Sequence, residues 1–367
     1  MRLLFKLAGI IVVLLVVALI SLSFVLSYDA SCGQASLVPG NAKLMKAIVY
    51  RCYGPPDVLA LEDIEKPTAA ADEVLVKIRA ASVNPLDWHY MRGSPSLMRL
   101  MSGIGAPKNT RLGVDFAGTV EAVGINVVRY KPGDEVFGGK TGAFAEYVAV
   151  REDKALALMP SNMTFEQAAS VPIAAVTALQ ALRDKGQIQA GQKVLINGAS
   201  GGVGTFAVQI AKSFGAQVTG VCSTRNLEMV QSIGADHVFD YTKQDYTKSG
   251  EQYDLIIDNV GNRSLLANRA VMKPEGIMVM LGGSKGNWVG PMIGPLKASF
   301  LSPFVSQTFL MIMAQLDSED LAILADLMQA GTVTPVIDRR YPLSEVADAI
   351  AYIEEGHARG KVVVYMD

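Results

Sequence analysis

The chain has 367 residues, half of them hydrophobic, and a formal net charge of −2. This length fits a membrane-proximal segment followed by two ordinary domains. A chain so close to neutrality lacks the basic surface of a nucleic-acid-binding protein, so we expect no nucleic acid among its partners. The three cysteines, Cys32, Cys52 and Cys222, lack metal-ligand spacing and predict no disulfide framework.

The N-terminus carries an uncharged apolar stretch at residues 7–28, preceded by Arg2 and Lys6. A helix of this length covers about 30 Å, which is the thickness of the hydrocarbon core of a bilayer. Signal-peptide cores usually have only ~7–15 apolar residues, so the length favours a retained transmembrane anchor over residues 1–28. A cleaved export signal is the alternative.

Residues 29–44 contain Ser, Gly, Pro and Asn and are typical of a polar tether. A second natural start follows at Met45. From residue 45 to 164, short apolar runs alternate with glycine turns, which predicts a β-rich domain with little helix. The predicted strands lie at 46–50, 73–83, 116–124, 134–139 and 145–150.

The sequence KVLINGASGGVG, at residues 193–204, joins an apolar run to a turn with four glycines. A helical apolar pattern follows at 203–214, and a second apolar strand lies at 217–222. Together, the strand, glycine turn and helix place unhindered backbone N–H groups at a helix N-terminus, which favours a phosphate. The sequence therefore predicts a dinucleotide site. We expect the cofactor to contact Ser200, Gly201, Gly202 and Val203.

Further strands are predicted at 236–241, 254–260 and 276–283, with helical stretches between most of them. This alternation predicts a parallel, doubly wound sheet. The chain then ends in a last apolar strand at 361–366.

These motifs, in this order, resemble the medium-chain dehydrogenase/reductase superfamily, and within it the zinc-free quinone oxidoreductase and enoyl reductase branch. The resemblance implies an α/β fold with a GroES-like β-barrel domain (45–164) and a Rossmann-type, doubly wound NADPH-binding domain (165–312). Residues 313–367 would return to the barrel, and one transmembrane helix would precede the whole fold. Members of the family often pair through the cofactor sheet, so a homodimer is one candidate oligomer, and the sequence leaves the subunit number open. The motifs that carry it are ASVNPLDW (81–88), GVDFAGTVEAVG (113–124), KPGDEVFG (131–138), AASVPIAAVTAL (168–179), INGASGGVG (196–204) and GKVVV (360–364).

The zinc alcohol dehydrogenases of this superfamily hold a catalytic zinc with thiolate and imidazole ligands. The resemblance places their three ligand positions at Asn84, Val114 and Ile173, none of which can bind zinc. Without a Lewis acid, an alkoxide loses its main electrostatic support. We therefore expect no zinc, and we expect reduction of an electron-poor quinone or α,β-unsaturated carbonyl compound.

The end of the second Rossmann strand indicates the cofactor. An acidic residue at that place binds the ribose of NAD, whereas this chain has Ser223, Thr224 and Arg225. Two hydroxyls and a guanidinium can bind the 2′-phosphate of NADPH, and each charge-assisted bond contributes roughly 1.5–3 kcal/mol. The resemblance implies further cofactor contacts at Thr177, Tyr241, Asn259, Gly261, Gly282 and Gly283.

Hydride transfer leaves an oxygen on the substrate that must be stabilised and protonated. In related reductases a polar or tyrosine side chain just after the Asn-Pro motif faces the substrate. Here the spacing allows either His89 or Tyr90 at that place, and Asn84 could donate a hydrogen bond to a carbonyl. These three residues are the predicted catalytic residues.

The leading hypothesis is a membrane-tethered, NADPH-dependent reductase of lipophilic quinones or α,β-unsaturated carbonyl compounds. One alternative is an NAD(P)-dependent alcohol or aldehyde dehydrogenase. The other is a non-catalytic, membrane-associated NADPH-binding protein.

The charges around residues 7–28 conflict over which side of the membrane the enzyme faces. Arg2 and Lys6 favour an N-terminus on the inside, which would send the catalytic domains outward, where NADPH is scarce. Lys43, Lys46 and Arg51 follow the stretch and weaken this bias. The expected location is a membrane, or the exterior after signal cleavage, with the side left open.

Overall fold

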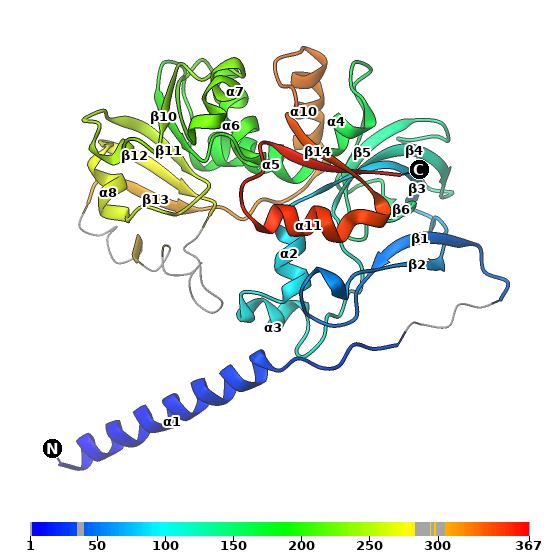
Figure 1. Ribbon diagram of the computed structural model, residues 1–367, viewed down its shortest axis with the longest axis horizontal. Coiled ribbons are helices and arrows are strands. Elements are labelled where there is room, and N and C mark those ends of the chain that lie inside the picture. The colour runs from blue at the N-terminus through cyan, green and yellow to red at the C-terminus, as the bar shows by residue number, and fades with distance from the viewer. Residues whose placement is uncertain (1, 35–39, 283–293, 295–296, 299–304, 367) are drawn as a thin grey trace.

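The computed structural model describes residues 2–34, 40–282, 294, 297–298 and 305–366 (Figure 1). The chain forms an N-terminal helix, a β-barrel domain and a domain built on a parallel sheet, and the C-terminal strands return to the barrel. The predicted combination of a β-barrel and a doubly wound parallel sheet is confirmed.

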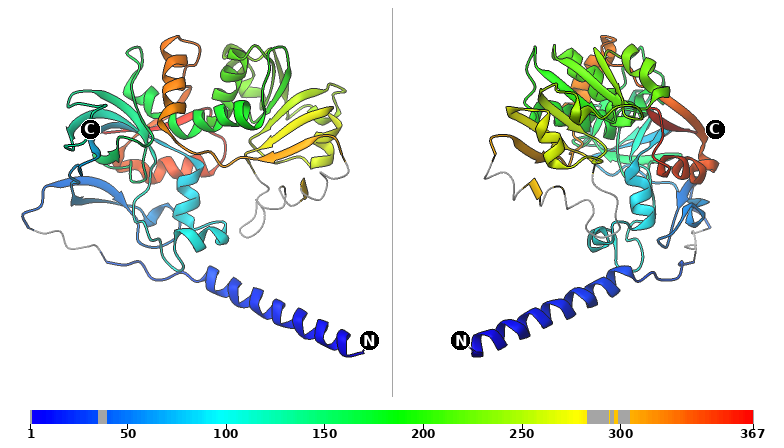
Figure 2. Two further views of the ribbon diagram at one scale, coloured as in Figure 1. Left: turned by 180° about the vertical axis from the view of Figure 1, so that it is seen from behind. Right: turned by 60° about the vertical axis from the view of Figure 1, so that its left-hand side comes forward.

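Helix α1 covers Arg2–Ser27 and projects away from the rest of the molecule (Figure 2). Over the described residues, no helix is both long and apolar enough to cross a membrane. The side chains of residues 2–12, 15 and 19 lie outside the description, so the predicted span at 7–28 is described only in part.

The barrel contains a seven-stranded sheet in which β15, from the C-terminal end of the chain, pairs with the early strand β3. Strand β15 lies between β14 and β3, and the order continues through β4, β5 and β7, with β6 paired to β3. Strands β1 (Leu44–Val49) and β2 (Ala60–Glu65) form a separate antiparallel pair. The sheet strands are β3 (Glu73–Val83), β4 (Asp115–Val123), β5 (Glu135–Gly139), β6 (Tyr147–Arg151), β7 (Leu156–Leu158), β14 (Ile337–Pro342) and β15 (Lys361–Tyr365).

The second sheet has the strand order β10-β9-β8-β11-β12-β13, and every neighbouring pair is parallel. This order is that of a dinucleotide-binding fold, in which the ligand lies at the carboxyl ends of the central strands. The strands are β8 (Lys193–Asn197), β9 (Gln217–Cys222), β10 (His237–Asp240), β11 (Tyr253–Asp258), β12 (Met272–Met280) and β13 (Thr308–Met311).

Helices cover the sheets and join the two domains. One buried apolar cluster runs from Phe137 of the barrel through Leu179 to Ile196 of the parallel sheet, each at most 1% exposed. This shared core holds the two sheets in a defined relation. The helices are α2 (Pro85–Arg92), α3 (Arg99–Ser102), α4 (Phe165–Ala169), α5 (Pro172–Gln180), α6 (Gly202–Ser213), α7 (Leu227–Ser232), α8 (Leu265–Ala270), α10 (Ser318–Gln329) and α11 (Val346–Glu354).

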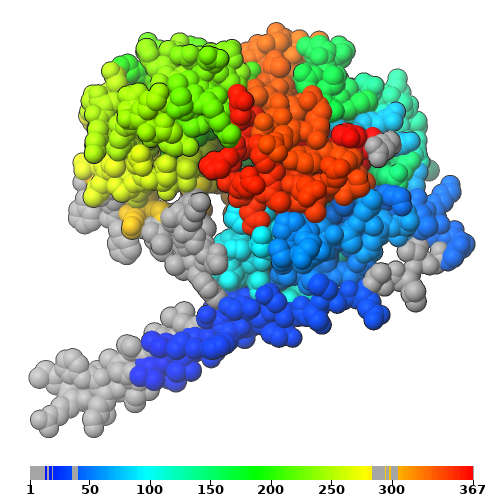
Figure 3. All heavy atoms as spheres, in the orientation of Figure 1, coloured from blue at the N-terminus to red at the C-terminus, as the bar shows by residue number. Residues whose placement is uncertain are grey.

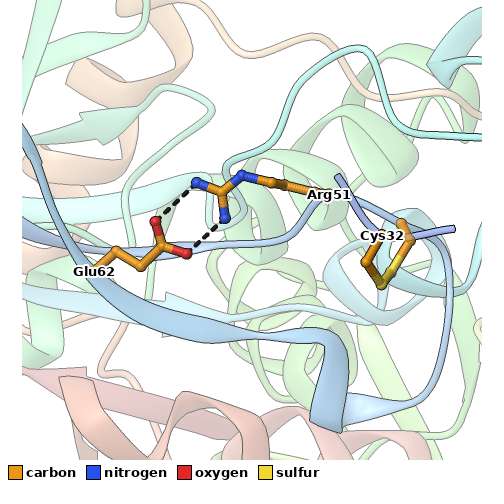
Figure 4. The surroundings of a disulfide bond; sticks show 4 residues. Cys32, Arg51 and Glu62 are labelled. Carbon is orange, nitrogen blue, oxygen red and sulfur yellow. Dashed lines mark hydrogen bonds and ion pairs between the residues drawn. A yellow bond between two sulfur atoms is a disulfide. The ribbon is translucent and has the colours of Figure 1, made fainter. Parts of the chain in front are cut away.

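A disulfide joins Cys32 to Cys52, with their Cα atoms 4.7 Å apart (Figure 4). The expectation of no disulfide is therefore wrong for this pair. Spacing could not reveal it, because the pairing depends on the N-terminal segment folding back onto the barrel. Beside the bond, Arg51 forms a two-point ion pair with Glu62, at 2.5 and 2.8 Å.

Candidate active site

The glycine turn before α6 leaves space at the helix N-terminus. Gly201 caps α6 with extended backbone angles, and a Cβ added there would meet only the Gly198 oxygen, at 3.6 Å. A Cβ on Gly204 would instead overlap the backbone of Gly198 and Ala199. Gly204 is thus required by packing, whereas the space at Gly201 is open. Exposed N–H groups at a helix N-terminus suit a diphosphate, so the turn fits the predicted cofactor.

The barrel closes one side of this turn. The Gly360 N–H donates to the Ser200 carbonyl at 2.9 Å, and Gly360 also pairs with Gly201 as an isolated bridge. A Cβ on Gly202 would lie 3.2 Å from the Lys361 Cδ. The start of β15 therefore lies against the predicted cofactor site.

The loop after β11 holds a buried acceptor without a partner. Asn259 donates from Nδ2 to the Asn197 carbonyl at 3.0 Å, but its Oδ1 has no hydrogen-bond partner among the described residues. The Gly261 N–H donates to Asp258, and a Cβ on Gly282 would overlap the Asn259 backbone. An unpaired buried acceptor at the carboxyl end of a parallel strand fits the hydroxyl groups of a cofactor ribose.

The segment after β9 uses some of its polar groups internally. The Thr224 hydroxyl donates to Asp240 at 2.6 Å, and Arg225 donates one N–H to the His357 carbonyl at 2.6 Å. Hydrogen bonds from Thr224 and Thr242 lower the pKa of Asp240 to about 2. Thr224 therefore has no proton left for a phosphate, whereas Arg225 keeps most of its five donors.

Asn226 is a polar residue that the sequence did not single out. Its Nδ2 donates to the hydroxyls of Ser200 and Ser223 at 3.0 and 3.2 Å, which connects two predicted cofactor residues. Its buried Oδ1 has no partner among the described residues. The sequence did contain a signal for Asn226 as a site residue, because it is a polar residue directly after the Ser-Thr-Arg run of residues 223–225.

The remaining predicted cofactor residues are more loosely placed. Tyr241 is 45% exposed and its N–H donates to the Cys222 carbonyl. Thr177 is partly exposed on α5 and donates to the Ile173 carbonyl at 2.6 Å. Gly283 lies outside the described residues. Cofactor contact by these residues and by Val203, the second residue of α6, stays a prediction.

Asn84 lies in a buried polar network rather than on an open surface. It is 3% exposed, donates from Nδ2 to Asp115 at 2.9 Å and accepts from Lys361 Nζ at 2.6 Å. Its backbone N–H donates to Asp87 at 2.8 Å, which caps α2. Asn84 therefore has one N–H left, and direct contact with substrate stays a prediction.

The network carries opposite charges in a dry environment. Lys361 is 2% exposed and lies 3.4 Å from the fully buried Asp115, which also accepts from Ser82 and the Ile173 N–H. Burial lowers the pKa of Lys361 and raises that of Asp87 to about 7. A buried ion pair persists only when further hydrogen bonds satisfy its atoms, as they do here.

The three positions aligned with zinc ligands come together around Asp115. Asn84 and the Ile173 N–H both bond to the Asp115 carboxylate, and Val114 is its chain neighbour. No group of three or more His, Cys, Asp or Glu side chains in the described part of the chain could hold a metal ion. Absence of zinc from the protein stays a prediction.

His89 and Tyr90 lie on α2, which begins at the network. His89 Nδ1 is 2.7 Å from the Ser94 carbonyl, and its ring stacks on Trp88 with 3.6 Å between centroids. Burial lowers the pKa of His89, so the ring is neutral near pH 7, with its proton on Nδ1 facing the carbonyl. Tyr90 is partly buried and packs against the apolar cluster that contains Tyr50. Their catalytic roles stay predictions.

Two sequence-family models match the chain. One is described as an alcohol dehydrogenase GroES-like domain and matches residues 70–161; the other, described as a zinc-binding dehydrogenase, matches residues 233–364. The zinc-ligand positions Asn84, Val114 and Ile173 all lie outside the second match.

Named relatives cover nearly the whole fold. The chain is 34% identical to a 2-methylene-furan-3-one reductase of Solanum lycopersicum, over 92% of this chain and 84% of that protein. It is 36% identical to the chloroplastic NADPH-dependent alkenal/one oxidoreductase of Arabidopsis thaliana, over 88% and 80%. The structure of the quinone oxidoreductase from Coxiella burnetii is 30% identical, with a TM-score of 0.78, over 89% of this chain and all of that one.

Proposed function

Because this chain belongs to the medium-chain dehydrogenase/reductase superfamily, in its quinone oxidoreductase and enoyl reductase-like branch, we propose that it transfers a hydride from NADPH to quinones or α,β-unsaturated carbonyl compounds without zinc. The observation that carries this proposal is the open glycine cradle at Gly201, which lies against the network that contains Asn84. At the zinc positions that network offers an amide and two aliphatic side chains instead of metal ligands.

The cofactor supplies the hydride, and the chain supplies binding and orientation. The Gly201 N–H already donates to the Gly198 carbonyl at 3.2 Å, so the backbone N–H groups of residues 202 and 203 would hold the diphosphate. Asn259 Oδ1 would accept from a ribose hydroxyl. Arg225, with most of its N–H groups uncommitted, would bind the 2′-phosphate and favour NADPH over NADH.

The substrate would lie beside α2, within reach of the remaining Asn84 N–H. A conjugated acceptor needs little acid catalysis at the moment of hydride transfer, because its negative charge spreads onto an oxygen. Neutral His89 has a lone pair on Nε2, so it would accept rather than supply a proton, which leaves Tyr90 or water as the donor.

The test is to mix the purified protein with NADPH and a panel of quinones, enones and simple aldehydes. We expect oxidation of NADPH with the first two classes and none with the third, and less than stoichiometric zinc by elemental analysis. Cofactor binding without oxidation would favour the non-catalytic alternative. Turnover of simple alcohols with NADP⁺, together with bound zinc, would favour the dehydrogenase alternative.

We further propose that residues 7–28 attach the chain to a membrane and that the domains face an oxidising compartment. The uncharged sequence supports attachment, and most of the described α1 side chains are exposed, such as Phe24 at 76%, whereas Leu26 is buried against the barrel. The Cys32–Cys52 disulfide supports the oxidising side, as do Arg2 and Lys6.

Protease protection on sealed membranes, read together with thiol labelling under non-reducing conditions, tests this location. In inside-out vesicles, whose cytoplasmic face is exposed, we expect the domains to be protected from the protease because they lie in the lumen. We also expect Cys32 to stay unlabelled, because it is held in the disulfide. An accessible domain with a labelled Cys32 would place the enzyme on the reducing side, and an N-terminus beginning after residue 23 would indicate signal cleavage. A homodimer stays an expectation that light scattering can check.

A further inference from the structure

The segment after α1 is fastened to one corner of the barrel by a buried arginine. Arg99 is 6% exposed and donates to the carbonyls of Leu26 and Tyr28 at 3.0 and 3.2 Å. It also forms an ion pair with Asp29 at 2.8 Å. A buried guanidinium is stable only when its donors are matched, and here the N-terminal segment supplies much of that match. Residues 26–29 are therefore part of the folded domain, not of a free tether.

Four further contacts hold the same corner. The Ala30 N–H donates to the Gly105 carbonyl at 2.9 Å, and the Arg99 guanidinium lies over the Tyr53 ring at 4.5 Å. Tyr53 in turn donates to the Gly103 carbonyl at 2.8 Å, and the disulfide joins its neighbour Cys52 to Cys32. Several bonds thus hold the place at which α1 leaves the barrel. Figure 3 shows α1 extending from this corner of the molecule.

Between the fastening points Arg99 and Gly105, the corner exposes large apolar side chains. Leu100 is 51% exposed, Met101 83% and Ile104 53%. On the N-terminal segment, which Arg99 and Gly105 bind, Phe24 and Tyr28 are 76% and 63% exposed. The bonds from Arg99 to the Leu26 and Tyr28 carbonyls bring the two segments together, and exposed apolar groups gathered at one place on a surface indicate an interaction site. We call these five residues the apolar corner.

The neighbouring helix identifies what covers the apolar corner. Among the described side chains of α1, apolar residues from Val13 to Val25 are exposed around the whole helix, and residues 7–28 carry no charge. A helix that is apolar on every side lies in lipid rather than on a protein surface, which would leave one face polar. Tyr28, at the end of that helix, is a residue type that favours the membrane–water interface.

We propose that the apolar corner rests in the surface of a lipid bilayer, so that the barrel is held against the membrane with α2 and α3 facing it. This inference rests on the membrane attachment proposed above. It adds an orientation, because attachment through a free tether would leave the corner in water. It also favours lipophilic acceptors, since α2, with the predicted substrate residues, precedes α3 in the chain and lies on the same side of the barrel (Figure 1).

The full-length chain reconstituted in liposomes tests the orientation. A cysteine placed by Met101→Cys carries a fluorophore, and Ile125→Cys, at a position 93% exposed on another loop, is the matched control. The native Cys222 is buried and does not compete for the label. We expect lipids brominated along their chains to quench the label at 101 at least twofold and to leave the label at 125 unchanged.

Each other outcome would overturn the inference. If the protein floats with the liposomes but both labels stay unquenched, the corner lies in water. If the label at 101 is shielded only at high protein concentration and without lipid, a second copy covers it. If the protein does not float, membrane attachment fails as well. None of these results touches the reductase proposal, which NADPH oxidation by a water-soluble quinone tests separately.

A second variant links the corner to the substrate. Leu100→Glu with Met101→Glu should raise the KM for a long-tailed quinone in liposomes about tenfold and leave the kinetics with a short, water-soluble quinone unchanged. Equal effects on both quinones would mean that the corner acts on the site itself and not through lipid.

Discussion

The glycine turn at 198–204 and the network around Lys361 touch at Gly360, yet they are built in different ways. The turn uses backbone groups from one short stretch of chain. The network joins side chains that are 31, 246 and 277 residues apart in sequence. The turn is therefore sensitive to added volume, and the network to lost charge. Four experiments sharpen this contrast.

Removing the network's cation should have the largest effect. Lys361→Met leaves the buried Asp115 without its counter-charge, and breaking a buried pair in this way costs about 3–5 kcal/mol. Urea unfolding measures the loss, and Lys154→Met, at an exposed position, is the control. Adding Asp115→Asn to Lys361→Met should recover part of the loss. An unchanged midpoint for Lys361→Met would mean that the pair is not formed.

The next effect concerns pH. The pKa of Asp87 is raised to about 7, chiefly by burial, whereas an unfolded aspartate ionises near pH 3.9. Between about pH 4 and about pH 7 the folded protein therefore holds a proton that the unfolded chain has released. The contribution of Asp87 to the free energy of unfolding therefore decreases as the pH rises through that window, and it is constant above the window. Each pH unit of this window corresponds to about 1.4 kcal/mol of unfolding free energy. Over the roughly three units between the two pKa values, the effect is therefore at most about 4 kcal/mol.

Asp87→Asn removes this dependence. The unfolding free energy of the wild type minus that of Asp87→Asn should decrease between about pH 4 and about pH 7 and then stay constant. Urea unfolding at several pH values measures it. A difference that does not vary with pH would show that Asp87 is ionised throughout.

On the side of the turn, Gly201→Val should weaken NADPH binding about 100-fold, or ~2.7 kcal/mol, with little change in the melting temperature. An added Cβ at Gly201 meets only the Gly198 oxygen, at 3.6 Å, so the fold accommodates the branch point, while the valine methyl groups would fill the cradle. Gly40→Val, where an added Cβ meets nothing, is the control. Fluorescence titration measures affinity. Unchanged affinity would show that the diphosphate of NADPH does not bind at this turn.

The smallest effect is expected at the 2′-phosphate. Arg225→Ala should weaken NADPH binding by only about tenfold, because one donor of the arginine is already held by the His357 carbonyl. NADH binding should not change, because NADH lacks the 2′-phosphate. Equal losses for both cofactors would point to a structural role for that bond. The same titration with both cofactors separates the two results.

Local pattern was enough to predict the parallel sheet and the glycine turn. The apolar run at 194–196 and the helix starting at Gly202 are neighbours in the chain, so their spacing already determines where N–H groups point. Gly201 and Gly202 could be named as candidate cofactor residues for this reason, and their contact with the cofactor stays a prediction. Asn84 could be named, but its commitment to Asp115 and Lys361 could not be foreseen.

Residue types and near spacing were enough to predict most strands along the chain and a glycine turn suited to a diphosphate. The family resemblance then placed Asn84, Val114 and Ile173, whose side chains cannot bind zinc, at the zinc-ligand positions. The Cys32–Cys52 disulfide, the bonds from Arg99 to the N-terminal segment and the hydrogen bond from Lys361 to Asn84 became known from the folded structure alone. These contacts join residues from 20 to 277 positions apart. Residues so distant in the chain meet only once the sheets have packed, and no local pattern encodes that approach.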